Sequence, residues 1–374
     1  MLLQKVAYRV EGASGAFLRP TASARPRKRD GEPPLNRGEE NRPQLHERQI
    51  DVNGHPFRVL DQGDGPTVLF AHGFPDVGET WLSQMAGVAE AGYRAVALDM
   101  RGFGASYSPS SVELYSALHT VGDLVGVLDA LHISEAVLVG HDWGADVAQR
   151  AMVLRPDLFR GLVSLSIPFL PRGEASLWSQ LKKDGLGDSY YAFEMMKPDG
   201  HLAFEPAAAS IPSALYWLSG SPAVGEGWDP VDSSRGMLRP APVGVPAWAD
   251  PTYVSHSIAA FQGSGFATGL NYYRASDITF EQMSAFKGVP IRQPALYIWG
   301  AEDGLCQLFH PEPPTVEQLR ASAPGLVDVV RLEGVGHWPQ HEAAERVTAE
   351  ILAFLAGIEW QCTSDTGAES ESER

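Results

Sequence analysis

The sequence predicts an α/β protein whose mostly parallel, doubly wound sheet is covered by helices on both faces. Short β-rich runs alternate with segments of helix length along most of the chain, as expected for successive βα units. Several runs are apolar throughout, which suits strands that are buried on both faces. Apolar residues recur at helical spacing over 121–131, where we expect a helix. The expected strands are residues 57–61, 67–71, 95–99, 136–140, 162–166, 295–299 and 327–332.

The two ends of the chain have compositions that do not suit a packed core. Residues 1–45 and 361–374 are rich in charged and small residues, so we expect a disordered leader and a disordered tail. Polar residues interrupt the first apolar run too early for a secretory signal, which favours a cytoplasmic location. Residues 12–29 are rich in Ala, Ser and Arg, a composition also found in organelle transit peptides, so targeting to an organelle is the alternative.

The regular alternation stops in the middle of the chain and resumes near Pro294. We therefore expect a core made of residues 46–166 and 291–360, with residues 167–290 inserted as a mainly helical cap. Prolines recur over residues 206–251, which predicts a long excursion with little regular structure.

Composition limits the classes of partner. The net charge of −17 argues against nucleic acid, whose phosphates require clustered basic residues, and favours a small neutral or apolar ligand. Apolar runs stay well short of the roughly 18 residues of a membrane span. Cys306 and Cys362 are too few for a disulfide framework or a cysteine-ligated metal, so we expect a reducing compartment, no metal and no cofactor. The oligomeric state stays open.

A Gly-His-Asp-Trp-Gly segment at residues 140–144 directly follows an apolar run. A sharp turn from strand to helix needs glycine at both ends, because backbone and neighbouring strands approach too closely for a Cβ. Asp142 then stands in the position of a nucleophile. An aspartate with an ordinary pKa of about 3.9 is ionised at neutral pH and can attack without a base. The resulting ester would need a histidine to activate water for its hydrolysis.

Two later residues complete a triad with Asp142. Asp303 follows the expected strand 295–299, and His337 follows the strand 327–332. Their order along the chain, nucleophile then acid then histidine, is one in which such triads occur. The acid would hold the imidazole in one tautomer. Trp338, beside the histidine, is expected to support this loop or to contact the substrate.

A His-Gly-Phe-Pro segment at residues 72–75 follows the first buried strand of the core. The backbone amide of Phe74 can be aimed there at a developing oxyanion, with the amide of Trp143 as its partner. The oxyanion would form on the Asp142 carboxyl group as water attacks the ester. We expect His72 to support this loop.

Together these segments resemble the epoxide hydrolase branch of the α/β-hydrolase superfamily over about residues 46–360. The segment Arg-Gly-Phe-Gly-Ala-Ser at 101–106 also resembles a loop of that superfamily, and we expect Asp99 and Arg101 to pair and brace it. The resemblance implies an α/β-hydrolase fold and the cofactor-independent conversion of an epoxide and water to a vicinal diol.

Epoxide hydrolases of this type use two cap tyrosines to hold and protonate the epoxide oxygen, and the resemblance assigns candidates. Asn-Tyr-Tyr-Arg at 271–274 resembles the family's N-[WY]-Y-R segment, which makes Tyr273 the second tyrosine. Tyr191 has the family's spacing to Pro198, although Met-Met-Lys replaces the usual Phe-Gln-Glu before that proline. Tyr190 is the adjacent alternative.

Two other functions fit the same residues. A haloalkane or haloacid dehalogenase would use the same Asp142, but it releases a stable halide without needing an acid, and the haloalkane enzymes usually carry Asn where this chain has Phe74. A non-catalytic protein of the same fold could bind a small ligand beneath the cap. Which epoxide, carbon and enantiomer are used does not follow from the sequence.

Overall fold

The computed structural model describes residues 43–169, 172–187, 189–309 and 314–360. The expected tail, and the expected leader with its targeting segment up to residue 42, lie outside these ranges. None of the helices within them is long and apolar enough to cross a lipid bilayer.

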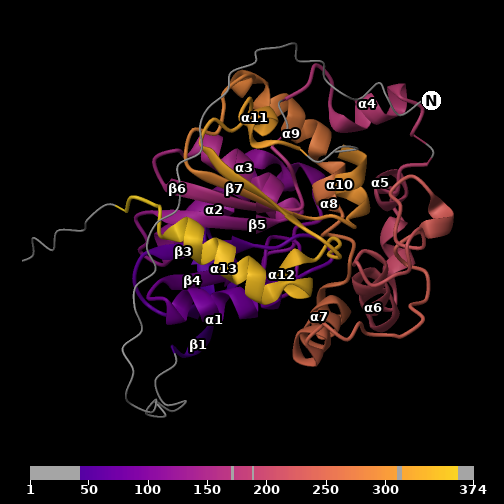
Figure 1. Cartoon of the computed structure of the whole chain (residues 1–374), viewed down its shortest axis with the longest axis horizontal. Helices are drawn as coiled ribbons and strands as arrows, with labels where there is room; N and C mark the ends of the chain where they lie inside the picture. The colour runs from indigo at the N-terminus through magenta and orange to yellow at the C-terminus, as the bar shows by residue number, and fades with distance from the viewer. Residues whose placement is uncertain (1–42, 170–171, 188, 310–313, 361–374) are drawn as a thin grey trace, which may run out of the picture. The chain divides into compact units, whose positions relative to one another are not determined.

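The described residues form one eight-stranded sheet in the order β1-β2-β4-β3-β5-β6-β7-β8 (Figure 1). The strands β1 and β2, and β2 and β4, pair antiparallel, and all other neighbours pair parallel. The predicted fold class is therefore confirmed. The strands are β1 (Leu45–Val52), β2 (His55–Gln62), β3 (Thr67–Ala71), β4 (Arg94–Leu98), β5 (Ala136–His141), β6 (Phe159–Leu165), β7 (Ala295–Gly300) and β8 (Leu326–Leu332).

Strand β1 was not among the strands expected from the sequence. It lies at the edge of the sheet, and its residues from Leu45 to Gln49 are exposed. An exposed edge strand buries little apolar surface, so it lacks the apolar run by which the inner strands were recognised.

Helices cover both faces of the sheet. Along β3, Val68 and Phe70 belong to the apolar cluster that α1 and α13 share, while Leu69 and Ala71 belong to the cluster of α2 and α3. This alternation explains why the inner strands are apolar throughout. The helix expected over 121–131 is α2, which begins four residues earlier. The core helices are η3 (Gly78–Trp81), α1 (Leu82–Glu90), η4 (Val112–Tyr115), α2 (Ala117–Ala130), α3 (Trp143–Leu154), α10 (Gly304–Phe309), α11 (Val316–Leu319), α12 (Pro339–Glu342) and α13 (Ala344–Leu355).

The regular structure between β6 and β7 is helical in the described residues, and we call residues 167–290 the cap segment. Figure 1 shows α5, α6 and α7 gathered beyond one end of the sheet. The elements of the cap segment are α4 (Leu177–Lys183), α5 (Ala192–Met195), η5 (Gly200–Phe204), α6 (Ala207–Trp217), η6 (Ser233–Arg235), α7 (Pro251–Ser264), α8 (Asn271–Arg274), α9 (Ser276–Gln282) and η7 (Met283–Phe286).

The expectation of little regular structure over 206–251 is wrong for its first part, which forms α6. Pro206 stands at the N-cap, where its missing N–H costs nothing, and Pro212 is accommodated inside the helix. The buried Ile211 and Leu215 lie one turn apart on α6, so packing of an apolar face stabilises it. Residues 218–250 contain only η6.

Candidate active site

Asp142 lies in a tight turn between β5 and α3, with φ 51° and ψ −121°. A side chain at positive φ is strained by roughly 1–3 kcal/mol, which the neighbouring packing must offset. Three glycines allow that packing. At Gly144, an added Cβ would lie 2.1 Å from the carbonyl oxygen of Ala71. At Gly140, it would lie 2.6 Å from the carbonyl oxygen of Gly144, and at Gly73 it would lie 2.4 Å from the Asp142 side chain. The turn therefore needs glycine at each of these positions.

The Asp142 carboxylate is held by backbone amides. The Phe74 amide donates to Oδ1 at 2.9 Å, and the Trp143 amide also stabilises the charged form. Burial raises the pKa of Asp142, while the His337 charge and the two amides act in the opposite direction. The two residues expected to form the oxyanion site thus both lie at this carboxyl group.

His337 lies between the two expected carboxylates. Its Nδ1 donates to Oδ2 of the fully buried Asp303 at 2.9 Å, and its Nε2 is 3.8 Å from Oδ2 of Asp142. The Leu305 amide donates to Oδ1 of Asp303 at 2.9 Å. Burial alone would lower the pKa of His337, but the charge and hydrogen bond of Asp303 and the charge of Asp142 together raise it. The structure thus brings all three expected triad residues together.

The backbone of His337 is fixed from three sides. Its carbonyl oxygen accepts from His141 Nε2 at 2.7 Å and from Ser166 Oγ at 3.2 Å, and its amide donates to the Leu218 carbonyl at 2.7 Å. Because Leu218 follows α6, the cap segment holds the histidine directly.

Glu342 is a half-buried residue of this loop that the sequence did not reveal. Its carboxylate accepts from the amides of Gly220, Gly336 and Trp338 at 2.8–3.1 Å, and burial raises its pKa to about 7. The Trp338 ring is buried, lies 5.1 Å from the His337 ring and donates from Nε1 to the Ala214 carbonyl at 3.4 Å. This placement matches loop support, the first of the two roles expected for Trp338.

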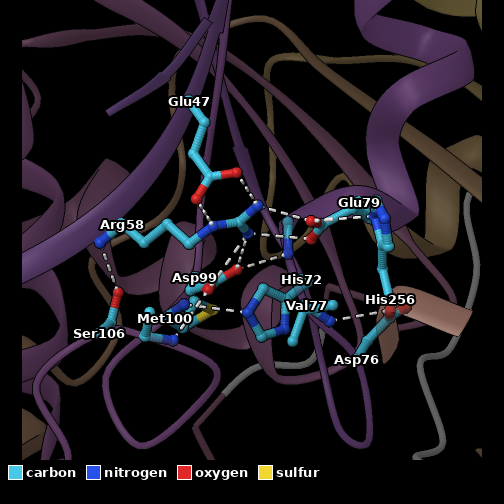
Figure 2. Close-up of polar contacts among 12 residues, drawn as sticks. Glu47, Arg58, His72, Asp76, Val77, Glu79, Asp99, Met100, Ser106 and His256 are labelled. Atoms are coloured by element: carbon cyan, nitrogen blue, oxygen red, sulfur yellow. Dashed lines mark hydrogen bonds and ion pairs between the residues drawn. The ribbon is translucent and has the colours of Figure 1, made fainter. Parts of the chain in front are cut away.

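The His72 ring is held by two hydrogen bonds, and Figure 2 shows it beside Met100. Its Nδ1 donates to the Gly73 carbonyl at 2.8 Å, and its Nε2 accepts from the Met100 amide at 2.9 Å. Burial lowers the pKa of His72 to about 4, so the ring is neutral and makes both bonds at physiological pH. This geometry fits the expected supporting role.

The expected pairing of Asp99 with Arg101 is wrong. Asp99 pairs with Arg58 at 3.3 Å, and Figure 2 shows the Arg58 guanidinium also facing Glu47 and Glu79. Arg101 pairs instead with Asp123 of α2. The antiparallel pairing of β2 with β4 brings Arg58 beside the end of β4, a neighbour that sequence spacing does not reveal.

The two expected cap tyrosines lie close together. Tyr191 directly precedes α5, Tyr273 lies in α8, and their ring centroids are 6.2 Å apart with the planes at 86°. The Tyr273 ring packs edge-on against Phe74 at 6.0 Å and Trp143 at 4.8 Å, the residues whose amides hold Asp142. Burial raises the pKa of both phenols well above its usual value, and the charge of Asp142 adds to this effect. Both phenols are therefore protonated at neutral pH.

Tyr190 lies beside Tyr191, with ring centroids 4.8 Å apart. Its ring also lies 6.1 Å from Trp178 and 6.4 Å from Phe193, whereas the Tyr191 ring lies against Tyr273 and Trp228. The geometry therefore favours Tyr191 over Tyr190 as the partner of Tyr273.

Comparison with known proteins agrees with this geometry. The model of the α/β hydrolase fold matches residues 66–344. An epoxide hydrolase from Caballeronia sordidicola is 48% identical over 315 residues, which cover 84% of this chain and 95% of that protein. The chain belongs to the epoxide hydrolase family. Epoxide hydrolase A from Mycobacterium tuberculosis is 33% identical over 333 residues, which cover 84% of this chain and 98% of that protein. The solved structure of an epoxide hydrolase from an endophytic Streptomyces matches with a TM-score of 0.77 at 32% identity, covering 84% of this chain and 96% of that one.

This epoxide hydrolase family member also carries a contact between cap and core that the sequence analysis missed. The Tyr253 hydroxyl in α7 donates to Oδ1 of the buried Asp76 at 2.9 Å, and the Val77 amide donates to the same oxygen at 2.9 Å. Burial raises the pKa of Asp76 to about 7. The only sequence signal was an acid directly after the His-Gly-Phe-Pro segment, which by itself does not reveal a partner in the cap segment.

Proposed function

We propose that this protein converts an epoxide and water to a vicinal diol through an ester formed on Asp142. The observation that carries the proposal is the arrangement of one amide-held carboxylate beside a buried His–Asp pair, together with two cap phenols whose rings lie close to each other. The core residues supply a nucleophile and a base, and the cap segment supplies two acids. Hydrolysis of an epoxide through an ester uses a nucleophile to open the ring, acids to protonate the oxygen that leaves as an alkoxide, and a base to activate water.

In the first step, an Asp142 carboxylate oxygen attacks one epoxide carbon and the bond from that carbon to the epoxide oxygen breaks. Tyr191 and Tyr273 hold that oxygen, and one of them gives it a proton. Phenols suit this role, because burial keeps them protonated at neutral pH while an alkoxide is far more basic. The product of this step is a hydroxyalkyl ester of Asp142.

In the second step, His337 takes a proton from water, and the water oxygen attacks the carbonyl carbon of the ester. Formation of the ester removes the negative charge of Asp142, which had helped to raise the pKa of His337. The pKa of His337 therefore falls once the ester has formed, which favours the neutral imidazole that can accept a proton from water. The amides of Phe74 and Trp143 hold the oxyanion. Its collapse breaks the ester bond, His337 returns its proton to the leaving oxygen of the diol, and the carboxyl group of Asp142 is regenerated. That carboxyl group then loses a proton to solvent and the tyrosinate takes one back, which restores the enzyme.

Single-turnover hydrolysis in heavy-oxygen water tests this route, with enzyme in excess over styrene, terpene and fatty-acid epoxides. We expect the first diol to carry no label and Asp142 to acquire it, because the second diol oxygen comes from the carboxylate. Labelled diol in the first turnover would contradict the ester route. Halide release from a chloroalkane would instead indicate a dehalogenase, and ligand-induced stabilisation without any product would indicate a binding protein.

A further inference from the structure

We propose that Arg274 is a positioning residue that fixes the two cap phenols relative to each other and thereby controls the ring-opening step. The inference rests on the proposed function, in which Tyr191 and Tyr273 act together on one oxygen atom. Arg274 directly follows Tyr273 in α8 and reaches across to the segment that follows Tyr191.

The guanidinium of Arg274 makes five hydrogen bonds, and all of its acceptors are uncharged. Three acceptors are the backbone carbonyls of residues 195–197. The other two acceptors lie close to Arg274 in sequence: the Ala267 carbonyl, before α8, at 3.0 Å and the Asn271 Oδ1, in α8, at 2.9 Å. The bonds to residues 195–197 run from Nη2 to Met195 at 3.5 Å, from Nε to Met196 at 3.2 Å and from Nη2 to Lys197 at 2.8 Å.

The three carbonyls form the C-terminal end of α5, the short helix that begins directly after Tyr191. Carbonyls at a helix C-terminus lack partners within the helix and carry partial negative charge. A helix of four residues is also too short to be stable without external contacts. The planar guanidinium of Arg274 donates to the free carbonyls and supplies the external contacts that so short a helix requires. It thereby connects the helix that follows Tyr191 to the helix that bears Tyr273.

These contacts also account for the departure from the family pattern before Pro198. Arg274 binds main-chain oxygens of residues 195–197, so the side chains there can be Met, Met and Lys without loss of the contact. Arg274 is half-buried, and burial lowers its pKa.

The first test separates the two steps in single-turnover kinetics. Arg274→Met should slow ring opening by about 10- to 100-fold, since a displacement near 1 Å in an active site can cost about 10²-fold. Ester hydrolysis should change by less than about twofold. Arg274→Lys should recover only part of the rate, because an ammonium lacks the fork. Equal slowing of both steps would overturn the proposal.

Arg239→Met is the matched control. Arg239 is also a cap arginine whose pKa burial lowers. Its guanidinium donates to the carbonyls of Gly236 and Glu226 at 3.0 and 2.8 Å, and thus to a loop other than α5 and α8. We expect it to leave both steps unchanged.

A double-mutant cycle shows whether Arg274 acts through the phenols. In a Tyr191→Phe/Tyr273→Phe background, Arg274→Met should slow ring opening by less than about twofold, because the groups that it positions are gone. A loss there as large as in the wild-type background would overturn the proposal.

Hydrogen exchange tests the same contact without any substrate. Arg274→Met should speed exchange of the amides of residues 194–197 at least tenfold and leave β5 and α3 unchanged, while Arg239→Met should not affect these amides. Unchanged exchange in α5 would overturn the positioning role whatever the activity. If the wild-type protein opens no epoxide, the proposed function fails, and this measurement still decides whether Arg274 holds α5.

Discussion

The two halves of the site rest on different kinds of support. Asp142, Asp303 and His337 follow the carboxyl ends of the parallel strands β5, β7 and β8, so the buried sheet sets their positions. Tyr191 and Tyr273 stand at or within helices of four residues, whose positions depend on hydrogen bonds from distant side chains. The nucleophile and base are therefore held rigidly, and the acids are held by contacts that single substitutions can remove.

The largest effect is expected from breaking the core half at its nucleophile. Asp142→Ala should lower kcat by at least about 10⁴-fold and leave no ester, because no neighbouring group can replace the carboxylate. Steady-state assay and intact mass measure the two outcomes. Asp129→Ala, on the exposed face of α2, is the control and should keep full activity. Substantial turnover by the Asp142 variant would mean that water attacks the epoxide directly.

The second effect concerns the base of the core half. His337→Gln should still open the epoxide once and then accumulate the ester on Asp142, with hydrolysis slowed by about 10³-fold. Intact mass should show one adduct per chain after mixing with epoxide. A variant that forms no adduct at all would place His337 in the first step.

The third-largest effect is expected from a substitution in the cap half, at Tyr273. Tyr273→Phe should slow ring opening by about 10²-fold and ester hydrolysis by less than about threefold, because the phenol acts only on the leaving oxygen. Rapid-quench kinetics separates the two rates. Tyr272→Phe is the neighbouring control, since the Tyr272 ring packs against Phe103 and Tyr115. Equal loss in both steps would reduce Tyr273 to a packing role.

The same difference in support explains what could be predicted from the sequence. The core half follows from local patterns, because an apolar strand and the turn after it lie together in the chain, and parallel strand ends meet at one edge of the sheet. The family was predicted from these segments and is confirmed by the comparisons. The cap tyrosines came only from the resemblance, since the surrounding helices are too short to leave a periodic pattern.

The contacts that the sequence did not reveal depend on tertiary structure. Glu342 and Arg274 act on backbone amides and carbonyls, which every residue possesses, so no side-chain pattern marks their partners. The pairing of Asp99 was predicted wrongly for a related reason: its partner Arg58 comes from a neighbouring strand and not from its own loop. Partners that follow the carboxyl ends of parallel strands were predictable, and partners supplied by helix packing or by the pairing of β2 with β4 were not.

The smallest effect on activity is expected at Asp76, where the two halves meet. Its folded pKa of about 7 lies above the usual value of 3.8, so the stability that its protonated form contributes is fully present below pH 3.8 and is lost as pH rises through about 7. Asp76→Asn keeps an acceptor for Tyr253 and does not ionise. The variant should therefore gain stability relative to the wild type between pH 5 and 8, by at most about 4 kcal/mol.

Thermal unfolding of both proteins across this pH range measures the Asp76 effect. Glu342 also has a raised pKa of about 7, but it is present in both proteins and cancels in the difference. Parallel curves would mean that Asp76 does not titrate with folding. A gap that widens as the pH rises toward 7 would show that ionising the buried Asp76 carboxyl group lowers the folding stability, even though the Tyr253 hydroxyl and the Val77 amide favour its charged form.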